Sequence, residues 1–226
     1  MGLGSYRRGI TDPYYATPQV LLQALAEIIR KEVQALIDEG VSYIQIDAPN
    51  YTSLADPHQR ERLRQAGIDP DQTLAEAIAV DNASLAVVRR GGTILAMHLC
   101  RGNSRSRWLA EGSYEPVARQ LFQGLAVDRF LLEYDSERAG GFEPLRFVPG
   151  NTTVVLGLIT TKESQMESQE KLLRHIEEAA HYIPLERLAI SPQCGFASSA
   201  PGNLLTVGDQ WRKLESVVEI ARSVWG

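Results

Sequence analysis

The regular alternation of amphipathic and apolar segments constrains the fold of this chain more than any other feature. Helical patterns are expected at residues 19–39, 73–90, 115–126, 167–182 and 208–225. Strand patterns are expected at residues 41–47, 93–99, 129–133, 153–159 and 188–191. Helices that alternate with strands indicate a parallel sheet covered by helices. We therefore expect an α/β fold with five parallel strands, forming a single domain over residues 1–226.

Local patterns support several of these elements. Leu21, Leu25 and Ile28 share one helical face, and Gly40 provides a stop signal for that helix. Residues 153–159 lack polar alternation, as expected for a strand buried on both faces. Thr73 with Glu76 resembles a capping box and predicts a helix start there. Residues 1–19 and the polar stretch 48–72 are expected to be loops.

Composition excludes several classes of protein. The 226 residues are 44% hydrophobic, with a formal net charge of −5, so nucleic acid and anionic membranes are not expected partners. No apolar run approaches the roughly 18 residues of a membrane span, and the N-terminus lacks the apolar region of a secretory signal. Two cysteines do not make a disulfide framework. A reduced, cytoplasmic protein is expected.

Potential metal ligands lie at the ends of the predicted strands. His98 and Cys100 are two residues apart, so their side chains point to the same side of a strand. Cys194 follows the fifth strand, and Glu133 ends the third. In parallel α/β folds, sites form at the carboxyl ends of the strands. One nitrogen, two sulfurs and one oxygen form a ligand set that zinc accepts.

The spacing of these residues leaves a simpler interpretation open. A free cysteine in a buried strand often behaves as a small hydrophobic residue. A histidine or glutamate at a strand end can serve only as a hydrogen-bonding group. The chain has no C-x2-C pair, which argues against a structural zinc finger.

Three further groups of polar residues each allow both a functional and a purely structural interpretation. Asp47 could bind a substrate ammonium group, or it could cap the next loop or form a salt bridge. Arg101, with two further arginines in the same loop, could hold a carboxylate or phosphate, or the loop could simply be basic and solvated. Lys162 and Glu163 could exchange protons, although charged loops are common.

Four motifs together resemble the catalytic C-terminal domain of the cobalamin-independent methionine synthase family, and most closely its shorter single-barrel bacterial members. The similarity covers nearly the whole chain. The motifs are Y-I-Q-I-D-A-P at 43–49, H-L-C at 98–100, L-E-Y-D at 132–135 and S-P-Q-C-G at 191–195.

The resemblance implies a fold, a cofactor and a reaction. The fold is a (β/α)8 TIM barrel, of which about the last five strands correspond to this chain. The implied zinc ligands are His98, Cys100, Glu133 and Cys194. The implied reaction transfers a methyl group from 5-methyltetrahydrofolate to the sulfur of homocysteine, giving methionine. Zinc suits this chemistry because a bound thiol loses its proton and becomes the nucleophile.

The resemblance also suggests substrate contacts. Asp47 matches the aspartate that binds the amino group of homocysteine, and Gln45 and Arg101 are candidate substrate-binding residues beside it. Lys162 stands near the position of the family's proton-donating histidine and is a candidate for that function. Ala48 replaces an acidic residue of the family motif. The family's early barrel strands correspond to no part of this sequence.

Three hypotheses remain after the sequence analysis. The first is a zinc-dependent methyltransferase, or an alkyltransferase with another thiol or donor, such as coenzyme M and an epoxide. The second is a partial barrel that needs a second chain, or a second copy of itself, to cover its open sheet edges. The third is a zinc-binding module without catalytic activity.

Overall fold

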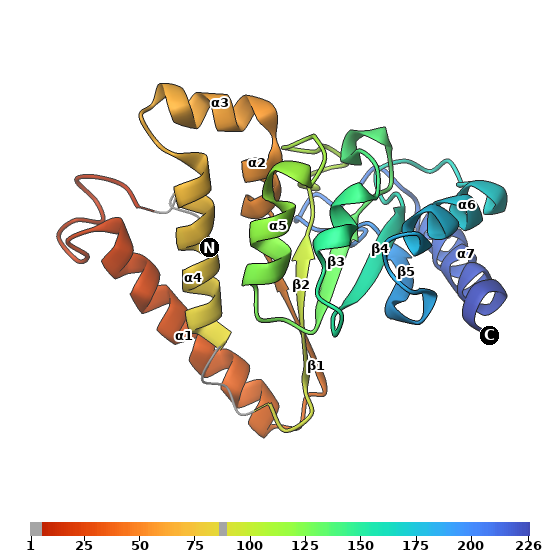
Figure 1. Cartoon of the computed structure of the whole chain (residues 1–226), viewed down its shortest axis with the longest axis horizontal. Helices are drawn as coiled ribbons and strands as arrows, with labels where there is room; N and C mark the ends of the chain where they lie inside the picture. Colours follow the sequence, from red (N-terminus) through yellow and green to blue (C-terminus); the bar gives the residue numbers. More distant parts are fainter. Residues whose placement is uncertain (1–5, 86–89) are drawn as a thin grey trace.

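Five parallel strands form one sheet in the part of the chain that the computed structural model describes, residues 6–85 and 90–226 (Figure 1). The strand order in space is the same as in sequence, and every neighbouring pair is parallel. This confirms the predicted α/β class. The strands are β1 (Tyr43–Asp47), β2 (Ile94–Leu99), β3 (Arg129–Glu133), β4 (Thr153–Ile159) and β5 (Leu188–Pro192).

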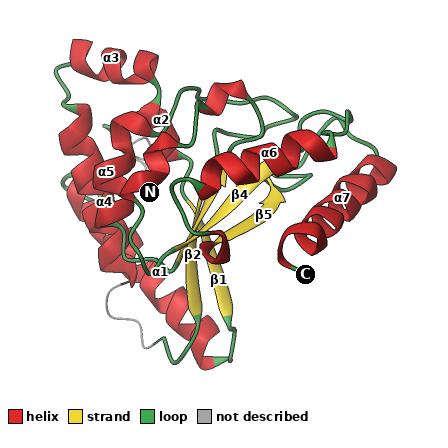
Figure 2. Ribbon diagram, turned by 45° about the vertical axis from the view of Figure 1, so that its right-hand side comes forward, coloured by secondary structure: helices red, strands yellow, loops and turns green. Residues whose placement is uncertain are grey.

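Helices connect the strands and cover one face of the sheet (Figure 2). Helix α1 packs against α4, α4 against α5, and α7 against both α6 and β5. The α-helices are α1 (Pro18–Asp38), α2 (Asn50–Ala55), α3 (Pro57–Gln65), α4 (Pro70–Leu85), α5 (Glu115–Gly124), α6 (Gln169–Ala180) and α7 (Val207–Trp225). Short 3-10 helices are η2 (Glu137–Ala139), η3 (Glu143–Phe147) and η4 (Leu185–Arg187).

The two faces of the sheet differ in burial. Residues such as Leu95, Phe130 and Leu156 point into the apolar core beneath the helices. On the other face of the edge strand β1, Tyr43, Gln45 and Asp47 are exposed. His98 pairs with Asp47 in the sheet, and Leu131, two residues before Glu133, pairs with His98. Because residues two apart in a strand point to the same face, this second face includes both His98 and Glu133. The side of the sheet that these helices leave open therefore carries the polar residues Gln45, Asp47, His98 and Glu133.

The stretch between β1 and α4 contains two helices, so the prediction of a loop over residues 48–72 was wrong. Asp56 and Pro57 look like a turn in sequence, but they begin helix α3. The Asp56 carboxylate accepts hydrogen bonds from the backbone N–H groups of His58 and Gln59, and Pro57 occupies the first helical position. In α2, Tyr51 and three other residues are buried.

Helix α4 begins before the predicted position. It starts at Pro70, and the Asp69 carboxylate accepts from the N–H of Asp71 at 2.9 Å. Thr73 lies inside the helix, where its hydroxyl donates to the Asp69 carbonyl, so the predicted capping box at Thr73 was wrong. The helix was expected to reach residue 90; it extends to Leu85, and residues 86–89 lie outside the described part of the chain. The same holds for residues 1–5 of the predicted N-terminal loop.

The end of β5 approaches β4 closely at Gly157. A Cβ atom at this position would lie 2.8 Å from the Cα of Gln193 and 2.9 Å from the carbonyl oxygen of Leu132. The pairing of β4 with β5 is irregular between Gly157 and Ile159. Only glycine permits this approach, which turns the chain inward just before Cys194. None of the helices in the described ranges combines the length and hydropathy needed to cross a membrane.

Candidate metal centre

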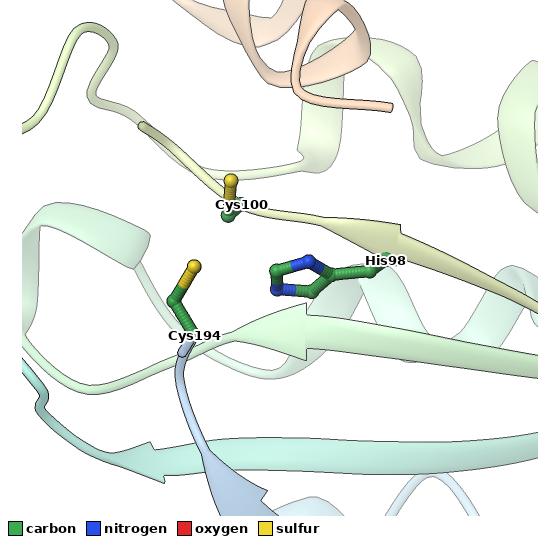
Figure 3. A group of neighbouring side chains, drawn as sticks. All are labelled: His98, Cys100 and Cys194. Carbon is green, nitrogen blue, oxygen red and sulfur yellow. The ribbon is translucent and has the colours of Figure 1, made fainter. Parts of the chain in front are cut away.

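His98, Cys100 and Cys194 lie together at the carboxyl end of the sheet (Figure 3). Their nitrogen and sulfur ligand atoms are all within 4.8 Å of one another. Strands β2 and β5 are three positions apart in the sheet, a separation of roughly 14 Å if the sheet were flat. The close approach therefore requires a curved sheet and an inward turn after β5. Consistent with that turn, the Gln193 carbonyl accepts from His98 Nε2 at 3.0 Å.

The imidazole of His98 is held at both nitrogens. Its Nδ1 donates to Asp47 Oδ1 at 2.9 Å, and its Nε2 donates to the carbonyl beside Cys194. Burial alone would lower the pKa of His98, but Asp47, the Gln193 carbonyl and the nearby Cys194 together raise it. The hydrogen bond from His98 in turn lowers the pKa of Asp47. The carboxylate thereby fixes the ring orientation, as second-sphere carboxylates do for metal-binding histidines.

The two cysteines behave as one acid that has lost a proton. A hydrogen bond from Cys100 lowers the pKa of Cys194, while the same bond, followed by burial, raises the pKa of Cys100. The hydroxyl of Ser198 lies 3.1 Å from Cys194 Sγ and adds to the stabilisation of the thiolate. These surroundings favour the thiolate form of Cys194 and the thiol form of Cys100.

Glu133 does not lie in this group of ligand atoms, although the sequence predicted it as the fourth ligand. It is fully buried, and its carboxylate is surrounded by donors. Oε2 accepts from the backbone N–H of Arg101 at 2.8 Å, and Oε1 accepts from Arg138 Nη2 at 3.2 Å and Lys162 Nζ at 3.3 Å. Asp135 joins the same cluster through Arg138. The structure thus brings together three of the four predicted ligands.

Arg101 is buried and contacts protein groups rather than open space. Its guanidinium donates to the carbonyls of Gly112 and Glu133 and to the hydroxyl of Tyr114, over whose ring it also lies. The Tyr114 hydroxyl accepts from the N–H of Glu133 and donates to the Leu99 carbonyl, and burial raises the pKa of this tyrosine to about 12. These contacts fix the ends of β2 and β3 beside each other.

The other predicted site residues have different environments. Gln45 is exposed on the open face, and its amide donates to Asp47 Oδ1 at 3.1 Å. Arg105 and Arg107 are exposed in the loop after Cys100, which fits the solvated basic loop considered above. Lys162 is buried and lies between Glu133 and Asp135.

A cavity of about 440 Å³ adjoins the Glu133 cluster. Three of its buried polar atoms have no hydrogen-bond partner among the described residues: Asp135 Oδ2, Ser136 Oγ and Arg138 Nε. Sequence reasoning gave these residues no function, although the L-E-Y-D motif contained Asp135. Buried polar atoms without a hydrogen-bond partner, on residues that line a cavity, are a sign of ligand binding. The lining includes Asp135, Arg138, Thr160, Lys162, Ser168 and Lys171.

The donor set fits zinc. Imidazole and thiolate are ligands that zinc accepts readily, and magnesium and calcium prefer oxygen. The surroundings of Cys194 lower its pKa and so favour a thiolate, and the histidine is oriented by a carboxylate, as in many zinc sites. These side chains could hold a soft divalent ion beside a cavity that accommodates an organic molecule. Such an arrangement can bind a thiol and activate it as a nucleophile.

Comparison with known proteins places this arrangement in a family. Residues 16–222 match the model of the cobalamin-independent synthase catalytic domain. The uncharacterized protein YxjH of Bacillus subtilis is 42% identical over 202 residues, which cover 89% of this chain and 53% of YxjH. The methionine synthase of Pyrococcus abyssi is 24% identical over 213 residues, covering 94% of this chain and 52% of that protein.

A solved structure shows the same fold. The structure described as a vitamin-B12-independent methionine synthase from Listeria monocytogenes superposes with a TM-score of 0.72 and 30% sequence identity. The match covers 95% of this chain and 58% of that one. The chain therefore spans about half the length of the curated relatives it matches. On this evidence the chain belongs to the cobalamin-independent methionine synthase family, in the part that forms its TIM-barrel catalytic domain.

Proposed function

We propose that this chain carries the zinc site of an S-methyltransferase that moves a methyl group from 5-methyltetrahydrofolate, or a related donor, to homocysteine, giving methionine. The observation that carries the proposal is the cluster of His98, Cys100 and Cys194, with ligand atoms within 4.8 Å of one another. Family membership supports the methyltransferase class. The donor set and the adjoining cavity support zinc and an organic second substrate.

Zinc would be held by His98, Cys100 and Cys194, with Glu133 as the fourth ligand. When bound, the ion supplies the positive charge that keeps a substrate thiol ionised at neutral pH. Glu133 must first leave its hydrogen bonds with Lys162 and Arg138. Cys100 must lose the proton that it shares with Cys194, and His98 must release its Nε2 proton, since metal ligands bind in their deprotonated forms.

The protein's own groups would orient the thiol substrate. Asp47 and Gln45 are exposed on the open face beside His98, where the carboxylate can bind an ammonium group. Arg101 would act indirectly, because its hydrogen bonds hold Glu133 and the Gly112 loop. This assignment differs from direct substrate binding by Arg101, which its burial argues against.

Lys162 would supply the proton that the methyl donor needs. In the transfer, the substrate sulfur forms a bond to the methyl carbon while the carbon–nitrogen bond breaks, and the electron pair stays on the donor nitrogen. That nitrogen must be protonated to leave as a neutral amine. Lys162 lines the cavity of about 440 Å³, so a methyl donor bound there would be within reach of its ammonium group.

A second proposal concerns the open face of the sheet. β1 and β5 are edge strands of the described sheet, and Tyr43, Gln45 and Asp47 are exposed on its polar side. We infer that further β/α units cover this face in the active protein, whether in the same polypeptide, in another chain or in a second copy. The relatives, about twice as long as the matched region, support this inference.

Metal analysis and turnover test these proposals separately. The purified chain is expected to contain about one zinc ion, and the Cys194→Ser variant to contain almost none. Unchanged zinc in the variant would contradict the ligand assignment. Methyl transfer from 5-methyltetrahydrofolate to homocysteine is then assayed. A separate assay measures alkylation of coenzyme M by an epoxide. Zinc without turnover in either assay would favour the need for additional β/α units.

A further inference from the structure

The segment that carries Cys194 has no regular secondary structure. It runs from the end of β5 to the start of α7. Among the described residues, its one backbone–backbone hydrogen bond to another part of the chain joins the Gln193 N–H to the Ile159 carbonyl at 2.8 Å, just before Cys194, and the others are turns within the segment. Cys100, by contrast, directly follows β2 and is buried. The position of the Cys194 sulfur therefore depends on side-chain contacts that hold this segment against the rest of the site.

Asn103 links the segment that carries Cys194 to the loops that follow β2 and β4. Its Nδ2 donates to the Gly195 carbonyl at 3.0 Å and to Thr161 Oγ1 at 3.0 Å, and it lies 3.4 Å from Ser198 Oγ. A backbone carbonyl can only accept, so the amide nitrogen must face this side. Asn103 itself is buried in the loop that follows Cys100.

Thr161 is the fixed point of this network. It is fully buried at the end of β4, and its hydroxyl also accepts from Gln193 Nε2 at 2.9 Å. Asn203, at the far end of the Cys194 segment, donates to the Thr161 carbonyl at 2.7 Å. The network therefore holds both ends of the segment and joins the loops after β2, β4 and β5.

We propose that Asn103 is a positioning residue for the metal centre, which holds the Gly195 carbonyl and Ser198 so that Cys194 faces His98 and Cys100. The proposal rests on the zinc site of the proposed function. Because the Asn103 amide donates to the serine oxygen, the Ser198 hydroxyl proton can point to the Cys194 sulfur at 3.1 Å or to the Gly195 carbonyl at 3.4 Å. Nothing in this arrangement requires Asn103 to touch substrate or metal.

Asn82 provides a matched control. It is an asparagine of α4 that also fixes a loop through both ends of its amide: Nδ2 donates to the Gly124 carbonyl at 2.6 Å, and Oδ1 accepts from the N–H of Ala126 at 2.9 Å. That loop precedes β3 at the opposite end of the sheet. Asn82→Ala therefore removes a comparable clamp without touching the metal centre.

The test compares Asn103→Ala with Asn82→Ala in the full chain. Zinc affinity is measured by competition with a chromophoric chelator, and thermal stability is measured on the zinc-free proteins. Asn103→Ala is expected to weaken zinc binding by about 10- to 100-fold, the range seen when groups that orient metal ligands are removed. Asn82→Ala should change zinc affinity by less than about twofold while lowering the melting temperature similarly. The absorption spectrum of the cobalt(II)-substituted protein should change only in Asn103→Ala, because only this variant displaces the Cys194 sulfur. Equal zinc weakening in both variants would overturn the proposal.

Hydrogen exchange on the zinc-free chain keeps the test independent of the proposed function. Asn103→Ala should speed exchange over residues 193–203, whereas Asn82→Ala should speed it over residues 124–128. If Asn103→Ala does not fold, Asn203→Ala provides the same test with a smaller effect, because it removes one end of the clamp. Unchanged exchange over 193–203 would refute the positioning role even if zinc binds. Absence of zinc from the parent chain would refute the proposed function while leaving the exchange result to decide the clamp.

Discussion

Two clusters of polar side chains lie at the same end of the sheet, and their charges are balanced in different ways. The cluster of His98, Cys100 and Cys194 contains three ligand atoms and no Lys or Arg partner among the described residues. The Glu133 carboxylate, next to it, is balanced by Lys162, Arg138 and a backbone N–H. In the proposed function the first cluster would receive an external cation, whereas the second already contains its own cations.

The difference between the two clusters predicts which ligand limits the binding of a metal ion. In the proposed zinc site, three ligands would only lose protons, whereas Glu133 would exchange two buried cations for zinc. A buried carboxylate that loses its partners is costly unless another charge replaces them. Zinc binding and the release of Lys162 are therefore expected to be coupled, which would free the lysine ammonium to face the cavity when the metal is present.

The largest effects should separate the contributions of the two clusters to the stability of the zinc-free protein. Cys100→Ser should reduce bound zinc from about one per chain to almost none, while the zinc-free stability changes little. Glu133→Gln should instead lower the free energy of unfolding of the zinc-free protein by about 3–5 kcal/mol, because Lys162 and Arg138 lose one of their two buried counter-charges and keep only Asp135. Metal analysis and urea denaturation measure the two quantities. Both variants should bind less zinc, because Glu133 is also a proposed ligand. A loss of zinc-free stability in Cys100→Ser as large as that in Glu133→Gln would mean that the two clusters form one unit.

Lys162→Met tests the proton donor within the second cluster. Loss of a general acid should lower kcat by about 10²- to 10⁴-fold in whichever form of the protein shows methyl transfer. Zinc content should be retained, and zinc affinity should rise, since one cation no longer competes for Glu133. Arg138→Met, which removes a cation from the same carboxylate, is the control for a purely electrostatic effect. Equal loss of kcat in the two variants would assign Lys162 a structural function.

Much of this difference between the two clusters could not be predicted from the sequence. Five strands and the N–S ligand group could be predicted, because His98 and Cys100 follow a two-residue period and Cys194 ends a separate strand. Glu133 also ends a strand, but its ion pairs come from Arg138 and Lys162 on later loops, and such pairing has no local signal. Asp56-Pro57 was misread because the same dipeptide suits both a turn and a helix start.

The carboxylate that orients His98 should have a smaller effect than the ligands. Asp47→Ala removes the acceptor of Nδ1 and should weaken zinc binding by about 10-fold, measured without any thiol substrate. Gln45→Ala is the matched control, because Gln45 donates to Asp47 and, within the described part of the chain, has no hydrogen bond to the imidazole. Unaltered zinc affinity in Asp47→Ala would limit this residue to binding the substrate ammonium.

The smallest effect concerns the pH dependence of the zinc-free protein. The pKa of His98 is raised, so its stabilisation is present below the unfolded value of about 6.5 and is lost as pH rises through the folded value. The pKa of Asp47 is lowered, so its stabilisation is present above about 3.9 and is lost as pH falls through the folded value. The contact should therefore contribute most between about pH 4 and 6.5.

Exposure of Asp47 limits the size of this effect. Its side chain is 68% exposed, so water screens the pair, and the contribution should stay below about 1 kcal/mol. The free energy of unfolding is measured by urea denaturation in the presence of a chelator, for the parent chain and for Asp47→Ala. Their difference should peak within the stated window and shrink on both sides, while Glu133→Gln should show no such peak. A constant difference across pH would mean that Asp47 acts on His98 through orientation alone, and that charge pairing at the metal centre is confined to the Glu133 cluster.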